Sequence, residues 1–79
     1  MPKKDGASAG SIDAHTVGTA AGEVWTYLKQ RGGHARLAAV KREVALSEPL
    51  LYMAMGWLAR EGKLETRQDA RVAYVMLKE

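Results

Sequence analysis

Residues 45–63, ALSEPLLYMAMGWLAREGK, decide the fold of this 79-residue chain. Ser47 is a natural N-cap, and Pro49 fits the first turn of a helix, where backbone amides have no intrahelical partner. Gly62 is a typical residue just after a helix, so we expect the helix to run from Ser47 to about Glu61. Apolar residues at helical spacing form its inner stripe: Leu51, Ala54, Met55 and Leu58.

A second, shorter helix is predicted just before this one. Leu37, Val40 and Val44 repeat at i, i+3 and i+7, although Arg36 offers no side-chain acceptor for an N-cap. Residues 34–35 can form a short extended strand ahead of it. Two helices joined by such a tight connection form a helix-turn-helix unit.

A longer helix opens the ordered part of the chain. It is predicted over about residues 17–31, because Lys29, Gln30 and Arg31 suit a helix C-terminus and residues 32–33 are a Gly pair that stops it. The apolar residues of its inner face are Val17, Ala21, Val24, Trp25 and Leu28.

The C-terminal residues predict a β-hairpin. Residues 63–67 and 72–77 are the two extended runs, and residues 68–71 are the turn. The second run is apolar at every position, with Val72, Tyr74 and Met76 on one face and Ala73, Val75 and Leu77 on the other. In a hairpin with one solvated face, apolar residues alternate with polar ones. This run has no polar residues, so we expect both of its faces to be covered.

This order of elements predicts a fold that is mainly α with a small antiparallel sheet. It is a winged helix-turn-helix domain, with three helices and a C-terminal β-hairpin as the wing. We assign the domain to residues 16–79. Residues 1–15 are rich in Gly, Ser, Ala and Lys and are predicted to be a disordered tail.

Three motifs resemble a known family. They are VGxxAGxVWxxL at residues 17–28, LS at residues 46–47 and AxGWLAREGK at residues 54–63. The family consists of small bacterial and archaeal stand-alone winged helix-turn-helix domains of unknown function. The resemblance covers about residues 17–77 and implies the fold and, by analogy, a regulator-like role. It implies no ligand, operator or catalytic residue.

One position departs from the pattern of that family. Its helix-turn-helix turn usually carries Gly where this chain has Ala45. A left-handed backbone at this position would cost Ala about 1 kcal/mol. The turn is therefore either shaped differently or strained.

Composition argues against several classes of protein. The chain has no cysteine, so neither a disulfide nor a thiolate metal site is available. It has no apolar run of membrane-spanning length and no secretory signal at its start, so we expect a cytoplasmic protein without a membrane partner. No HExxH motif, CxxC motif or carboxylate cluster is present. We therefore predict no enzyme, catalytic residue, cofactor, metal site or small-molecule ligand.

The weak positive charge fits double-stranded DNA or an acidic partner, and it fits equally well a solvated surface on which Glu65 and Asp69 pair with the basic residues. The chain has 12 Lys and Arg residues against 9 Asp and Glu residues, and the whole excess of +3 lies after residue 16. In a winged helix the second helix crosses the DNA backbone, the third enters the major groove and the wing grips its edge. The candidate DNA-binding residues are Arg36, Lys41, Arg42, Tyr52, Arg60, Arg67 and Arg71.

The surplus of apolar surface favours a homodimer. Leu50, Met53 and Trp57 recur at i, i+3 and i+7 on the flank of the third helix, where they either cap the core or contact a second copy. The strand with two apolar faces points the same way, and so small a domain is marginal as a monomer. The candidate interface residues are Leu50, Met53, Trp57, Val75 and Leu77.

Two functions remain open on these grounds. The leading one is a dimeric, transcription-regulator-like DNA-binding protein with electrostatic and weakly sequence-specific contacts. The outward face of the third helix carries Glu48 and Gly56 but, apart from Arg60, none of the side chains that usually read bases. The alternative is therefore a winged helix used for protein association without DNA.

Overall fold

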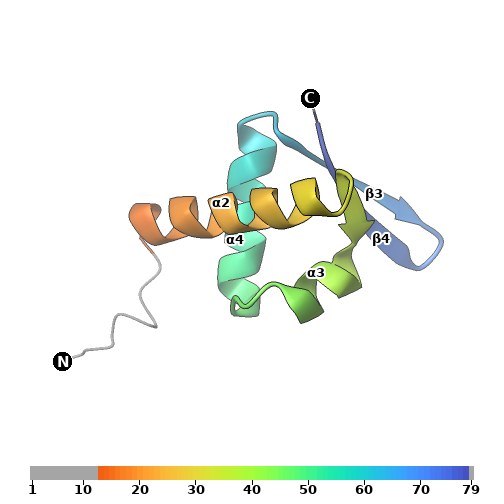
Figure 1. Ribbon diagram of the computed structural model, residues 1–79, viewed down its shortest axis with the longest axis horizontal. Coiled ribbons are helices and arrows are strands. Elements are labelled where there is room, and N and C mark those ends of the chain that lie inside the picture. The colour runs from red at the N-terminus through yellow and green to blue at the C-terminus, as the bar shows by residue number, and fades with distance from the viewer. Residues whose placement is uncertain (1–12, 79) are drawn as a thin grey trace.

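Three helices and a three-stranded antiparallel sheet form along residues 13–78, the part of the chain that the computed structural model describes (Figure 1). This arrangement confirms the predicted winged helix-turn-helix fold. The elements in chain order are α2 (Ala14–Gln30), β2 (His34–Arg36), α3 (Leu37–Glu43), α4 (Glu48–Arg60), β3 (Leu64–Asp69) and β4 (Val72–Leu77).

Helix α2 begins earlier than predicted. The carboxylate of Asp13 accepts a hydrogen bond of 2.8 Å from the backbone N–H of Thr16, which makes Asp13 the N-cap. The helix therefore starts at Ala14 rather than Val17, and Ala14 and His15, expected in the tail, belong to it. The remainder of the predicted tail, residues 1–12, lies outside the described part of the chain.

Glycines end both long helices. At the end of α4, Gly62 has φ 75° and donates a hydrogen bond to the carbonyl of Ala59, and the N–H of Lys63 donates to the carbonyl of Leu58. These two bonds satisfy carbonyls of the last turn in a Schellman motif, which needs a left-handed residue. Gly32, with φ 81°, ends α2 in the same way. The predicted stop signals are thus confirmed.

The turn between α3 and α4 is shaped differently from a glycine turn. The N–H of Leu46 donates to the carbonyl of Val44 over 2.8 Å, an i to i+2 bond that closes a γ-turn around Ala45. Ala45 keeps a negative φ, so its side chain causes no strain. Ser47 then caps α4 by accepting a hydrogen bond from the N–H of Leu50.

The sheet has the order β2-β4-β3, with β4 in the centre. The short strand predicted at residues 34–35 is confirmed and extends to Arg36. The hairpin turn is tighter than predicted, because Asp69 pairs with Val72 and leaves only Ala70 and Arg71 between the strands. Ala70 has φ 56° and Arg71 does not have a positive φ, as in a type II′ turn.

One core joins α2, α3, α4 and the sheet. The predicted burial of Leu28, Leu51, Met55 and Leu58 is confirmed. The predicted burial of Trp25 is wrong, because Ala20 and Ala21 shift the buried face of α2 away from it and leave it 39% exposed. The buried apolar residues are Ala20, Ala21, Val24, Leu28, Val40, Val44, Leu51, Ala54, Met55, Leu58, Leu64 and Val75.

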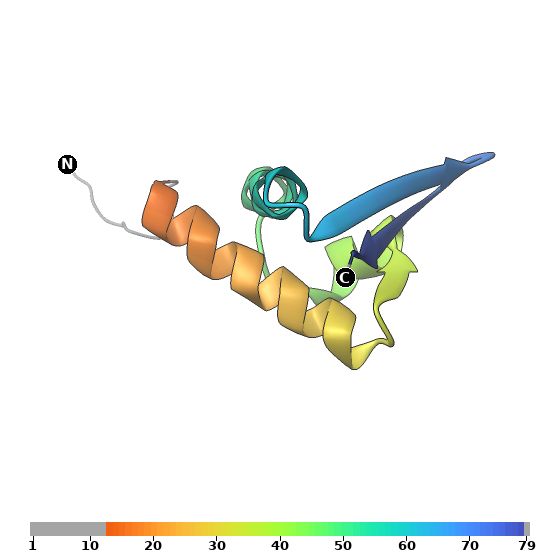
Figure 2. The ribbon, with the colours of Figure 1, turned by 90° about the horizontal axis from the view of Figure 1, so that it is seen from above.

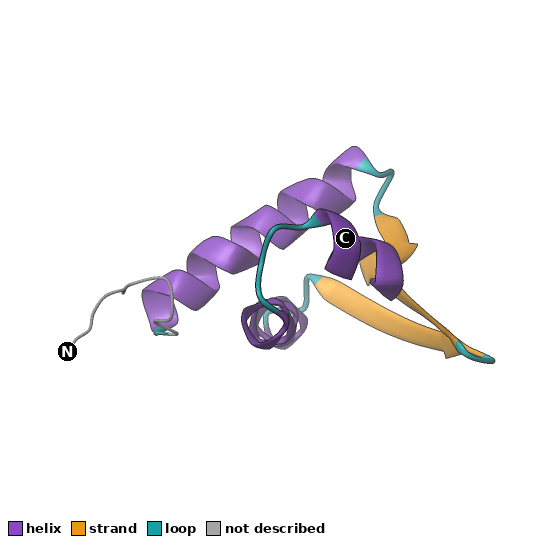
Figure 3. Ribbon diagram, turned by 90° about the horizontal axis from the view of Figure 1, so that it is seen from below, coloured by secondary structure: helices purple, strands orange, loops and turns teal. Residues whose placement is uncertain are grey.

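The register of β4 decides which of its faces meets the core. Val75 is only 1% exposed and packs inside the chain, so its predicted place at a dimer interface is wrong. Leu77 is half-buried against the same core. The helices gather on this side of the sheet, and the hairpin projects beyond them (Figures 2 and 3).

Truncating the last residue of the buried stripe of α4 tests this core. We expect Leu58→Ala to lower the free energy of unfolding by about 2–5 kcal/mol, because it leaves a cavity where α4 meets α2 and β3. Thermal unfolding followed by circular dichroism measures the effect. The exposed substitution Thr26→Ala is the control. A Leu58→Ala protein that melts like the wild type would contradict the α4 register.

Candidate nucleic-acid interface

The outward face of α4 is solvent-exposed, as the sequence predicts. Tyr52 is 43% exposed, and Arg60 lies two turns further along, about 12 Å away at the helical rise. Glu48 in the first turn forms an ion pair with Lys41, whose Nζ lies 2.9 Å from the Glu48 Oε2. The hydrogen bond to Glu48, and then one to Tyr52, raises the pKa of Lys41. The charge of Lys41, a predicted DNA contact, is therefore balanced within the helix-turn-helix unit.

Leaving aside Lys29, which lies over the Trp25 ring, ion pairing divides the arginines and lysines of the described chain into two sets. Carboxylates pair with Arg31, Lys41, Arg42, Lys63 and Lys78. Among residues 13–78, four arginines join no ion pair: Arg36, Arg60, Arg67 and Arg71. An unpaired guanidinium can bind a phosphate without first losing a carboxylate partner.

Three of these four arginines lie on the sheet and its turn. Arg36 ends β2, Arg67 is in β3, and Arg71 is in the hairpin turn. Arg36 and Arg71 line a hollow of about 300 Å³ with Lys41, where the start of α3 meets β4. We call it the wing-root hollow. It brings together three predicted DNA-binding residues from separate elements.

The remaining predicted DNA-binding residues lie apart from the wing-root hollow. Arg42 is highly exposed and has its guanidinium 3.8 Å from the Glu43 carboxylate. Arg60 sits in the last turn of α4. Arg67 lines a different hollow with Tyr74 on the sheet. The predicted set is therefore spread over at least two surfaces.

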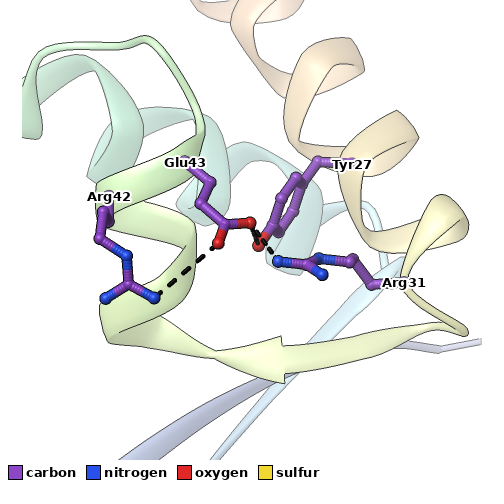
Figure 4. A network of polar contacts seen from close by, with 4 residues as sticks. All are labelled: Tyr27, Arg31, Arg42 and Glu43. Atoms are coloured by element: carbon purple, nitrogen blue, oxygen red, sulfur yellow. Dashed lines mark hydrogen bonds and ion pairs between the residues drawn. The ribbon is translucent and has the colours of Figure 1, made fainter.

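A polar network that sequence reasoning missed joins α2 to α3 (Figure 4). The Tyr27 hydroxyl donates a hydrogen bond of 2.8 Å to the Glu43 Oε1, and the Arg31 guanidinium donates to the same oxygen. Arg42 approaches the other carboxylate oxygen. Glu43 is the last residue of α3, so the network fixes the end of that helix against the last turns of α2. A lone carboxylate beside Lys41 and Arg42 was the only sequence signal for it.

The same network perturbs the titration of Glu43. The hydrogen bond from Tyr27 is the largest cause that lowers the pKa of Glu43 below its ordinary value of 4.5, while partial burial opposes it. Arg31 and Arg42 lower the pKa further by their positive charge. The ionised carboxylate is thus the form that the fold favours.

The predicted dimer surface is only partly exposed. Met53 is 52% and Trp57 is 37% exposed, whereas Leu50 is half-buried and packs against the core. Trp25 shares with Trp57 a hollow of about 400 Å³ between α2 and α4, and the Trp57 ring lies next to Gly18. We call Trp25, Met53 and Trp57 the indole surface. Trp25 was missed as a surface residue because its position borders the buried stripe.

Within residues 13–78, no cluster of three or more residues that could ligate a metal is found. None of the helices in that range combines the length and the hydropathy that a membrane crossing requires. His15 lies in the first turn of α2 and His34 begins β2, so the two histidines belong to different elements.

Comparison with known proteins bears on the fold. A family model described as a winged helix-turn-helix domain (DUF2582) matches residues 6–77. The matched range includes every element from α2 to β4 and agrees with the family resemblance of the three sequence motifs. No curated protein and no solved structure is significantly similar to the chain.

The Glu43 network predicts a pH-dependent contribution to stability. Because the folded-state pKa of Glu43 is lowered, its stabilisation is present above the unfolded pKa near 4.5 and is lost as the pH falls through the folded value. Glu43→Gln should lower the melting temperature at pH 7, and the difference from the wild type should shrink at pH 3. The control is Glu23→Gln, an exposed carboxylate of α2 that joins no ion pair in the described chain. Equal differences at both pH values would contradict the assignment.

Proposed function

The chain belongs to the winged helix-turn-helix family DUF2582, and from this we propose that it is a DNA-binding, transcription-regulator-like protein that acts as a homodimer. The observation that carries the proposal is the location of the arginines without ion pairs. Arg67 and Arg71 belong to the wing, and Arg36 is the N-cap residue of α3. In this fold the wing and the second helix are the elements expected to contact the DNA backbone or the minor groove.

The proposed contacts are mainly electrostatic. With α4 in the major groove, the wing-root hollow offers Arg36 and Arg71 to phosphates beside it. Glu48 occupies the first turn of α4 and is paired with Lys41, so neither side chain is free to read a base edge without breaking that pair. We therefore infer modest discrimination between DNA sequences.

A second copy of the chain is the proposed cover for the indole surface. Trp and Met are enriched at protein interfaces, and here two exposed indoles share one hollow beside an exposed Met. Val75 no longer belongs to the interface, and Leu50 and Leu77 contribute at most their outer edges because they pack against the core. Trp25, Met53 and Trp57 are the residues on which the dimer would depend.

The same surface supports the alternative function. An unrelated protein that binds Trp25 and Trp57 would also bury the indoles, and the acidic first turn of α4 would then never meet DNA. Binding measurements on duplex DNA separate the two functions.

The first test is a salt titration of duplex binding. The logarithm of the affinity should fall with the logarithm of salt concentration at about 0.9 per phosphate contacted. Arg67→Ala with Arg71→Ala should weaken binding to all sequences and make that slope shallower by about 1.8 for each copy of the chain on the DNA, which is about 3.6 for a dimer. The matched control is Lys63→Ala with Lys78→Ala, which removes the same charge from cations that already have carboxylate partners.

Two results would count against DNA binding by these arginines. One is a wild-type protein that does not bind duplex DNA at about 50 mM salt, where phosphate contacts are little screened. The other is a control pair that loses as much affinity as the arginine pair. The first would leave protein association as the leading function.

The second test is the oligomeric state. Sedimentation at micromolar concentration should give a mass near twice 8.6 kDa. Trp57→Ser should shift the protein to the monomer, because Trp57 is the larger of the two α4 side chains, Met53 and Trp57, that form the indole surface. Tyr52→Ser, an equally exposed aromatic outside the indole surface, should leave the dimer intact. A monomeric wild type would rule out the second copy as the cover.

A further inference from the structure

The face of the sheet that points away from the core carries an apolar ridge. Val75 and Leu77 of β4 meet the core, so strand alternation assigns Val72, Tyr74 and Met76 to the opposite face. All three are half-buried although the helices gather on the other side of the sheet (Figure 2). This ridge is the surplus apolar surface of β4 that the core does not use.

Two arginines flank the aromatic residue of the ridge. In the strand register, Tyr74 is opposite Arg36 of β2 and opposite Arg67 of β3. Strands are about 4.8 Å apart, so the two arginine backbones lie about 10 Å apart with Tyr74 between them. Both arginines are exposed, and neither has a carboxylate partner in the described chain.

The remaining charges of this face leave it positive around Tyr74. Glu65 lies 4.0 Å from the Nζ of Lys78, and His34 stands opposite Met76. Asp69 is the other carboxylate, nearer the hairpin turn. A hollow of about 340 Å³ opens over this face, lined by His34, Arg67, Asp69, Tyr74 and Met76.

We propose that this sheet face binds single-stranded nucleic acid. An unpaired base would stack on the Tyr74 ring within the hollow, and the guanidinium groups of Arg36 and Arg67 would contact the phosphates on either side. An aromatic side chain between unpaired cations is the combination that single strands require: a ring for the base and positive charge for the backbone.

The observations favour this occupant over a protein. A second copy of the chain on the same face would bring Arg36 and Arg67 close to their own equivalents, and like charges repel. An acidic peptide would satisfy the two arginines, but it would need an aromatic residue placed between its carboxylates to fill the hollow beside Tyr74, whereas every nucleotide carries a flat base next to its phosphate. The indole surface, on α2 and α4, is a separate place for a protein partner.

The single-strand site and the proposed duplex interface share arginines, but only the single-strand site depends on Tyr74. Arg36 and Arg67 serve both surfaces, but Tyr74 belongs to the sheet face alone. A substitution of Tyr74 therefore separates binding of single strands from binding of duplex DNA.

The test uses the full chain and fluorescently labelled ten-nucleotide strands of oligo(dT) and oligo(U), with a mixed-sequence duplex alongside. Tyr74→Val removes the ring and puts a β-branched residue, which also favours strands, in the central strand. We expect it to weaken single-strand binding by about 5- to 100-fold, as for one lost stacked base. Duplex affinity should stay within about twofold. Tyr74→Phe, which keeps the ring, should bind single strands like the wild type.

Circular dichroism establishes that each variant is folded. Should Tyr74→Val fail to fold, the larger β-branched substitution Tyr74→Ile replaces it, with the same expected loss of single-strand binding and the same unchanged duplex binding. A wild type that does not bind either strand, or a folded Tyr74→Val protein with unchanged affinity for both, would overturn the proposal. A wild type that binds single strands but does not bind the duplex would overturn only the proposed function in duplex binding.

Discussion

The packing of one side of α4 against α2 and the sheet governs the rest of the molecule. Leu51, Ala54 and Leu58 are almost fully buried on this side, and β3 begins two residues after the glycine that ends α4. Because a helix is rigid, burial of this stripe fixes the rotation of α4. The rotation in turn decides that Tyr52 and Arg60 face solvent and that Trp57 stands at the margin of the core.

The sequence predicted what local periodicity and capping determine. Ser47, Gly32 and Gly62 locate helix ends through their own backbone bonds, so these ends were predictable to within a residue or so. The face of β4 was not predictable, because both faces are apolar and the choice depends on pairing with β2, about forty residues earlier. Trp25 was assigned to the core because helical spacing alone does not distinguish fully buried residues from those at the edge of the buried stripe.

For the candidate nucleic-acid interface, the sequence shows where the basic residues lie but does not show which of them form ion pairs. The sequence identifies every Arg and Lys near the second helix and the wing, but not which of them a carboxylate already holds. Lys41 forms an ion pair with Glu48 across the helix-turn-helix turn, and Lys78 forms one with Glu65 across the hairpin. Arg67 and Arg71 have no carboxylate partner in the described chain. A modest excess of positive charge is thereby concentrated on the sheet and the wing.

The indole surface and the sheet face share no element, since one is built on α2 and α4 and the other on β2, β3 and β4. A homodimer that buries the first would leave the second open in each copy. Each dimer would then offer Arg36, Arg67 and Arg71 twice, and two linked sites bind a continuous polymer far more tightly than either alone. Dimerisation would also stabilise a domain too small for a large core. Stability and nucleic-acid binding would in this way depend on the same two tryptophans, although neither would touch the nucleic acid.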